Sequence, residues 1–125
     1  MEIISFIPTS FIDYPDLISC VIFTKGCNMC CDYCHNRGFM DSNESINENE
    51  IFSFLEKRKN KLDGLVISGG EPTLQKYLVL FCKKVKTYGY KIKLDTNGSN
   101  PQVLKELIEN NLIDFVAMDI KTSPS

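Results

Sequence analysis

Strand-like and helix-like segments alternate along most of this chain, and that alternation is what most narrows the folds open to it. Four apolar runs rich in β-branched residues have the length and composition of buried strands. They occupy residues 17–24, 63–70, 90–98 and 113–121. Three amphipathic segments with helical periodicity separate them, at 46–62, 75–89 and 100–111.

The ends of these helical segments carry ordinary start and stop signals. Asn47 and Glu50 have the spacing of a capping box, Pro101 suits a first helical turn, and Gly89 suits a helix end. Strand–helix–strand connections are right-handed and place successive strands parallel. The sequence therefore predicts an α/β fold with a parallel sheet of about four strands.

The length of the chain fits a single domain over residues 1–125. There are 125 residues, and no linker or low-complexity tract divides them. Residues 1–16 form a lead-in that has room for a short extra strand around Ile3 to Ile7.

Polar motifs follow the predicted strands at the points where each strand ends. "GCNMCCDYCHN", "SGGEPT", "DTNGS" and "MDIKT" come after the first, second, third and fourth strand in turn. Ligands of parallel α/β sheets bind at the carboxyl ends of the strands. The four motifs are thus expected to meet in one site.

The first motif is dense in cysteine. Cys27, Cys31 and Cys34 form a Cys-x3-Cys-x2-Cys pattern, and thiolates are soft ligands for zinc or for iron–sulfur clusters. Cys30 keeps a zinc alternative open, because it creates two abutting Cys-x2-Cys pairs beside His35. Zinc ribbons separate such pairs by a loop, so the abutting pairs argue against a zinc site. Three cysteines can bind three irons of a four-iron cluster, which leaves the fourth iron open.

The bulk composition points away from several other classes of protein. The net charge of −2 and the lack of a basic stripe argue against nucleic-acid binding. No apolar run reaches the roughly 20 residues of a membrane span, and the first residues do not resemble a signal peptide. We therefore expect a cytoplasmic protein whose six cysteines stay reduced, with Cys20 and Cys82 as core thiols.

Taken together, the motifs resemble those of the radical S-adenosylmethionine superfamily. Cys27-x3-Cys31-x2-Cys34 with Tyr33 before the last cysteine is similar to its signature. The whole set, "GCNMCCDYCHN", "ISGGEPTLQ", "LDTNGSNP" and "AMDIK", resembles the glycyl-radical-enzyme activating family, above all the branch that activates anaerobic ribonucleoside-triphosphate reductase. "FIDYPD" fits as well, although the family usually has glycine where this chain has Asp16.

The resemblance implies two cofactors and a ligand set. Cys27, Cys31 and Cys34 would hold a four-iron four-sulfur cluster whose open iron binds S-adenosylmethionine. The remaining contacts would come from all four motifs: Tyr33, His35 and Asn36 near the adenine, Ser68, Gly69, Gly70 and Glu71 near the methionine amino group, Asp95 and Thr96 near the carboxylate, and Lys121 paired with that carboxylate. In some relatives, the positions of Asp95, Thr96 and Asp119 bind a monovalent cation. No residue beyond the cluster ligands is expected to be catalytic.

The implied reaction is radical generation. An electron from a donor such as flavodoxin or ferredoxin would reduce the cluster and cleave S-adenosylmethionine to methionine and a 5′-deoxyadenosyl radical. That radical would take a hydrogen atom from a glycine of the partner, which the resemblance identifies as anaerobic ribonucleotide reductase. Activation of a pyruvate formate-lyase-type partner and a non-catalytic metal-binding remnant are the alternatives.

Length is the main departure from the resemblance. The family has a partial barrel of six β-α units, and about 30 residues per unit would need roughly 180 residues. A chain of 125 residues is therefore expected to be the N-terminal part, about four strands, of such a barrel.

Overall fold

A single five-stranded sheet organises the described part of the protein. The structure is a computed structural model, and it describes residues 1, 3–24 and 46–118. The strands are adjacent in chain order: β1 (Ile3–Ser10), β2 (Ser19–Thr24), β3 (Gly64–Gly69), β4 (Lys91–Thr96) and β5 (Phe115–Met118). β2 to β5 pair in parallel, whereas β1 pairs antiparallel with β2. The predicted α/β fold with a parallel sheet is confirmed.

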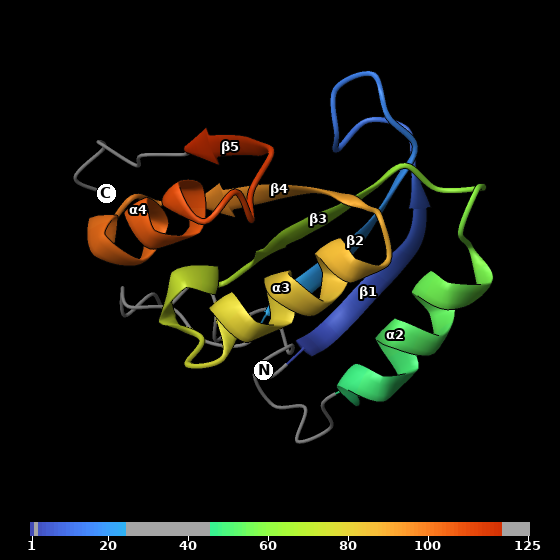
Figure 1. The fold of residues 1–125 in the computed structure, drawn as a ribbon, viewed down its shortest axis with the longest axis horizontal. Helices are drawn as coiled ribbons and strands as arrows, with labels where there is room; N and C mark the ends of the chain where they lie inside the picture. The colour runs from blue at the N-terminus through green and yellow to red at the C-terminus, as the bar shows by residue number, and fades with distance from the viewer. Residues whose placement is uncertain (2, 25–45, 119–125) are drawn as a thin grey trace, which may run out of the picture.

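Helices follow the strands and lie on one face of the sheet (Figure 1). They are α2 (Glu48–Lys57), the short 3-10 helix η2 (Pro72–Leu74), α3 (Leu78–Thr87) and α4 (Pro101–Glu109). Connections that stay on one face are expected when successive parallel strands are neighbours and every crossover is right-handed. None of the described helices is long and apolar enough to cross a bilayer.

The predicted capping residue of α2 is correct, but the predicted helices are longer than the observed ones. Asn47 caps α2, because its side-chain oxygen accepts a hydrogen bond from the Asn49 N–H at 2.8 Å. The helix then ends at Lys57 rather than near Leu62. The segment predicted to start a helix at Gln75 instead begins with η2, because Pro72 and the Glu71 cap favour a separate short turn, and α3 starts at Leu78.

The extra strand predicted in the lead-in around Ile3 to Ile7 is present and extends further, to Ser10. β1 has eight residues. The chain turns after it, and the Ser10 hydroxyl oxygen accepts hydrogen bonds from the N–H groups of Ile12 and Asp13 in this turn. Asp16 adopts a positive φ of 63°. Glycine adopts this left-handed conformation most easily and aspartate tolerates it, so the substitution noted at Asp16 is compatible with the turn.

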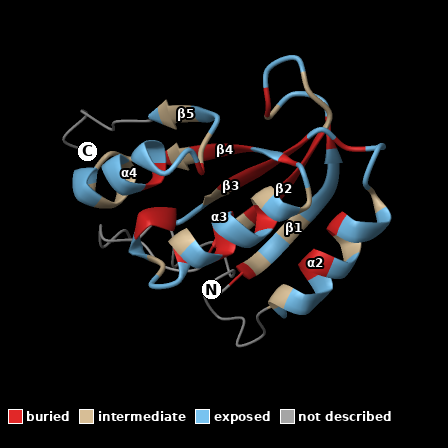
Figure 2. Ribbon diagram, in the orientation of Figure 1, coloured by how far each residue is buried: buried red, intermediate tan, exposed pale blue. Residues whose placement is uncertain are grey.

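The main core fills the space between the sheet and the helices. Alternate strand residues such as Ile22, Ile67 and Leu94 are fully buried against helix residues such as Leu55 and Phe81. Figure 2 shows the buried residues concentrated along the strands, with the exposed residues on the outer sides of the helices. Cys20 and Cys82 belong to this core, which confirms their prediction as core thiols.

The opposite face of the sheet carries a smaller cluster and then polar residues. Tyr14 packs on Val21 and Val66 close to the strand starts, where Gly64 leaves room for its ring. The next residues along the strands on this face include Ser68 and Asp95, because they follow the paired residues Ile67 and Leu94 by one position each. The polar part of this face therefore lies at the end of the sheet where β2 to β5 terminate, which we call the carboxyl end.

Candidate functional site

The predicted site residues divide into a described and an undescribed group. Those of the first and fourth motif lie outside the described residues: Cys27, Cys31, Cys34, Tyr33, His35 and Asn36 in 25–45, and Asp119 and Lys121 in 119–125. Their predicted roles stay predictions. The others are placed by the structure at the carboxyl end of the sheet: Ser68, Gly69, Gly70, Glu71, Asp95 and Thr96.

The loops after β3 and β4 are joined by direct hydrogen bonds. The Thr96 hydroxyl donates to Glu71 Oε2 at 2.6 Å, and the Asn97 N–H donates to Glu71 Oε1 at 2.7 Å. The second and third motif, which are about 25 residues apart in the sequence, are thus in contact, as expected for loops at one end of parallel strands.

The carboxylate of Glu71 also organises its own loop. Glu71 caps η2, since its Oε2 accepts from the Thr73 N–H at 3.1 Å and from the Thr73 hydroxyl. The side chain is almost completely buried, with 1% of the residue exposed. A buried carboxylate is tolerated only where hydrogen-bond donors surround it, and here two N–H groups and two hydroxyls do so.

The glycine at the end of β3 is required by the neighbouring strand. Gly69 has a φ of 108°, and a Cβ at this position would lie 2.3 Å from the backbone nitrogen of Thr24. Two hydrogen bonds hold the same place together: the Thr24 hydroxyl donates to the Ser68 carbonyl, and the Gly70 N–H donates to the Thr24 carbonyl, both at 3.2 Å. The start of the second motif is therefore fixed to the last described residue before the cysteine segment.

An ion pair stands next to these loops on the polar face. The Lys93 ammonium lies 2.8 Å from Asp95 Oδ1, with 11% of the lysine side chain and 30% of the aspartate side chain exposed. Both residues lie on the same side of β4, because side chains alternate along a strand. Asp95 is thus partly accessible and already has a cationic neighbour.

This donor and acceptor set suits a small zwitterion. The carboxylate of Asp95 is partly exposed and offers a partner for an α-amino group, while the mostly buried Lys93 ammonium holds that carboxylate in place. The backbone of Gly69 and Gly70 is exposed at the same end of the sheet and adds peptide groups. The described residues therefore fit the methionine part of S-adenosylmethionine.

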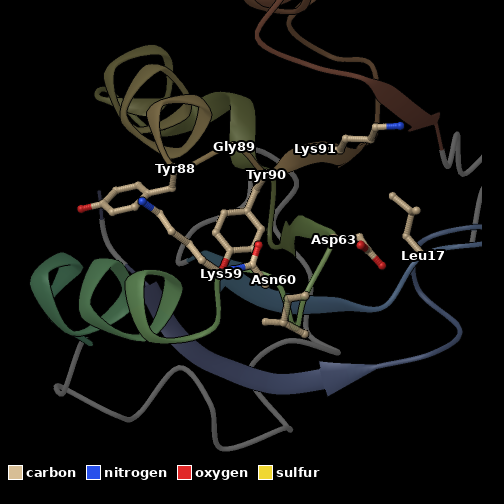
Figure 3. A pocket seen from close by; sticks show the side chains of 9 residues that line it. Leu17, Lys59, Asn60, Asp63, Tyr88, Gly89, Tyr90 and Lys91 are labelled. Carbon is tan, nitrogen blue, oxygen red and sulfur yellow. The ribbon is translucent and has the colours of Figure 1, made fainter.

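A cavity of about 520 Å³ lies elsewhere, at the opposite or amino end of the sheet. Figure 3 shows its lining, which includes Lys59, Asp63, Tyr88, Tyr90 and Lys91. None of the predicted site residues belongs to it. Its groups are engaged with one another and with the core: the Lys59 ammonium lies 5.3 Å from the centre of the Tyr88 ring, and the Tyr90 hydroxyl donates to the Leu55 carbonyl at 2.5 Å.

Three residues of the carboxyl end were missed by the sequence analysis. Lys93 could have been found from the alternation of β4, which places it on the same face as Asp95. Thr73 could have been found from the Glu-Pro-Thr spacing of a capped turn. Asn100 donates from Nδ2 to the Thr73 hydroxyl oxygen at 3.0 Å. This contact joins two loops, so no local sequence pattern indicates it.

Comparison with known proteins gives one family and several relatives. A family model described as the radical SAM superfamily matches residues 21–125. A protein of Methanocaldococcus jannaschii named as a glycyl-radical enzyme activating enzyme is 49% identical over 90% of this chain and 47% of its own length. The pyruvate formate-lyase-activating enzyme of Clostridium pasteurianum is 32% identical, over 83% of this chain and 46% of its own.

Other relatives carry different names. A 7-carboxy-7-deazaguanine synthase of Koribacter versatilis is 36% identical over 67% of this chain and 38% of its own length. The chain spans about half the length, or less, of these curated relatives. Since the family model covers most of the residues, the chain belongs to the radical SAM superfamily, whose members use a four-iron four-sulfur cluster and S-adenosylmethionine.

Proposed function

We propose that this chain is the cluster-binding and S-adenosylmethionine-binding part of a glycyl-radical-enzyme activating enzyme. The observation that carries the proposal is the joined carboxyl end of the sheet. There, Glu71 connects the second and third motif, and Thr24 ties the second motif to the strand that leads into the cysteine segment. The proposal treats residues 1–125 as one radical SAM core domain.

In this proposal each motif contacts a different part of the cluster or of S-adenosylmethionine. Cys27, Cys31 and Cys34 supply the thiolate ligands of the cluster, and a cytoplasmic location keeps them reduced. Tyr33 and the backbone of His35 and Asn36 take the adenine.

The third and fourth motif bind the amino and carboxylate end of S-adenosylmethionine. Asp95 and Thr96 lie near the methionine part, with Lys121 on its carboxylate. Asp119 completes an oxygen site with Asp95 and Thr96 that suits a monovalent cation, since hard cations prefer oxygen ligands.

The cofactors supply the chemistry, and the chain positions them. The cluster held by Cys27, Cys31 and Cys34 would pass one electron from a donor such as flavodoxin or ferredoxin to S-adenosylmethionine. This chemistry would leave methionine, 5′-deoxyadenosine and a glycyl radical on the partner. The exposed Gly69 and Gly70 backbone allows the ligand to lie close to the chain.

The partner that the motif set favours is anaerobic ribonucleoside-triphosphate reductase. The relative named as a glycyl-radical enzyme activating enzyme supports the class of partner, because its identity of 49% exceeds the 36% of the deazaguanine synthase relative. A pyruvate formate-lyase-type partner is the second candidate, and the 32% identity to the Clostridium enzyme supports it.

The test is anaerobic reconstitution with iron and sulfide, followed by reduction and addition of S-adenosylmethionine. We expect about four iron atoms per chain and formation of 5′-deoxyadenosine. Replacing Cys31 by alanine should abolish both. The matched variant Cys30→Ala should keep normal iron content, because Cys30 is not among the three proposed ligands.

Two results would overturn the proposal. Iron binding without 5′-deoxyadenosine would make the chain a metal-binding module, and preference for zinc over iron would make the cysteine segment a zinc site. If cleavage occurs, glycyl-radical formation on purified anaerobic reductase and on purified formate lyase, measured by electron paramagnetic resonance, separates the two partners.

A further inference from the structure

Glu71 holds a position that its predicted role as a ligand contact does not explain. It is a charged residue with only 1% of its surface exposed, inside a part of the protein that is otherwise open to solvent at Gly69 and Gly70. Carboxylates rarely become buried unless their oxygens are fully engaged. The partners of Glu71 therefore indicate what the side chain does.

Those partners come from two segments that are far apart in the sequence. The Thr73 N–H and hydroxyl, in the loop after β3, both donate to Oε2. The Thr96 hydroxyl, at the last residue of β4, donates to Oε2, and the Asn97 N–H, in the loop that follows, donates to Oε1. Four donors on one carboxylate leave the side chain directed into the protein and committed to these loops.

A second layer of hydrogen bonds extends the connection. The Thr96 hydroxyl oxygen accepts from the Gly98 N–H at 3.1 Å, and the Thr73 hydroxyl oxygen accepts from Asn100 Nδ2 at 3.0 Å. Asn100 directly precedes the first residue of α4. The network thus runs from the end of β3, through Glu71, to the loop after β4 and the start of α4.

We infer that Glu71 is a positioning residue, whose carboxylate holds Thr96 at the end of β4 and the adjacent Asn97 N–H so that Asp95, on the opposite side of the strand, faces the ligand, and that it does not itself contact the methionine amino group. Beside it, the backbone at Gly69 and Gly70 is exposed and remains for the ligand, apart from the Gly70 N–H, which is bonded to the Thr24 carbonyl. The part of this inference that concerns the ligand rests on the proposed function, whereas the part that concerns the loops does not.

The experiment separates a positioning role from a direct contact. We would compare Glu71→Gln, Thr73→Val and the matched control Glu109→Gln, whose side chain is 59% exposed on α4. Amide hydrogen exchange is measured on the full chain without ligand, and S-adenosylmethionine affinity on the reconstituted chain by equilibrium dialysis. Thr73→Val keeps the shape of the side chain and removes only its hydroxyl, so it remains informative if Glu71→Gln fails to fold.

A positioning role predicts linked losses in both measurements. In Glu71→Gln, exchange at the Asn97 and Thr73 amides should rise about tenfold or more, because charge-assisted hydrogen bonds are replaced by weaker ones. Affinity should fall in Glu71→Gln and, less strongly, in Thr73→Val, although Thr73 has no predicted ligand contact. The control should change neither quantity.

Two outcomes would overturn the inference. Loss of affinity in Glu71→Gln with unchanged exchange at Asn97 would mean that the carboxylate contacts the ligand directly. Unchanged affinity in Thr73→Val, with faster exchange at Asn97, would mean that the network does not position the site. If the wild-type chain bound no S-adenosylmethionine, the proposed function would fail, while the exchange measurement would still decide whether Glu71 holds the two loops.

Discussion

The two ends of the parallel sheet differ in how their polar groups are held. At the carboxyl end, a buried carboxylate and several short side chains connect two loops, and Gly69 packs tightly against Thr24. At the amino end there is a cavity of about 520 Å³, and its walls include long side chains such as Lys59 and Lys91. A cavity of this volume falls within the size range of small-molecule sites.

We propose the carboxyl end as the site because its polar groups are fixed by their neighbours, a criterion independent of cavity volume. Binding groups must be held in place by their neighbours before a ligand arrives, and short side chains in a closed hydrogen-bond network achieve this. Long lysines at the amino end lose rotamer freedom when they bind, which lowers the affinity they can provide. The carboxyl end is therefore the ligand-binding end in our account.

The largest expected difference between the two ends concerns a pair of glycines. Gly69 and Gly89 both have positive φ, at 108° and 88°, but a Cβ on Gly89 would meet no atom within 4 Å. Gly69→Ala should destabilise the protein by about 3 kcal/mol, since backbone strain and a clash with Thr24 add together. Gly89→Ala should cost about 1 kcal/mol from the backbone conformation alone.

Urea unfolding of the two variants under reducing conditions measures this difference. Equal losses of unfolding free energy would show that β2 and β3 do not need close contact at the carboxyl end, and the comparison would lose its structural basis.

A smaller difference is expected between two ion pairs. Asp95→Asn leaves the Lys93 ammonium mostly buried without its carboxylate, and we expect a loss of about 2 kcal/mol. Lys93→Met leaves a carboxylate that reaches water, so its loss should be about 1 kcal/mol. At the amino end, Lys59 pairs with Glu56 in solvent, and Lys59→Met should cost less than about 0.5 kcal/mol.

Thermal unfolding of Asp95→Asn, Lys93→Met and Lys59→Met tests this order of stability losses. If Lys59→Met destabilises the protein as much as Asp95→Asn does, the carboxyl-end pair is not held more firmly than a surface pair.

The two buried thiols of the core should have the smallest effect on the free energy of unfolding near neutral pH. Burial raises the pKa of the Cys20 and Cys82 thiols to about 12 from a usual value of 9.0. Both thiols stay protonated in the folded protein while the unfolded chain loses protons above pH 9. Stability should therefore be unaffected below pH 8 and should fall between about pH 9 and pH 12, by up to about 1.4 kcal/mol per pH unit and thiol.

The midpoint of urea unfolding at pH 7.5, 9 and 10 checks this expectation. The double variant Cys20→Ala/Cys82→Ala should show a shallower fall above pH 9 than the wild type. An identical pH dependence in the two proteins would mean that these thiols already ionise in the fold.

Much of the fold could be predicted because its signals are local. The β-branched run at 17–24 and the apolar stripe of the helix that contains Ile51 and Leu55 are readable without tertiary information. The sequence analysis did not give the direction of β1, although the short connection between Ser10 and Ser19 leaves no room for the crossover that a parallel pair needs. η2 was missed because three residues are too few to show a period.

The candidate site was predictable in location but not in detail. The position of Glu71 after a strand predicted that it would lie at the carboxyl end, and it does. The direction of its side chain depends on Thr96 and Asn97 in another loop, so no local pattern could show that it is buried. Gly69 was predicted as a place of close approach to a ligand, and the structure shows in addition that it is needed by Thr24.

The measurement that tests the central claim most directly is hydrogen exchange with and without S-adenosylmethionine on the anaerobically reconstituted chain. The account predicts that the ligand slows exchange in the segments 68–71 and 95–98 at the carboxyl end and leaves 59–63 and 88–91 unchanged. Slower exchange at 59–63 and 88–91 alone would place the ligand in the amino-end cavity and contradict the account.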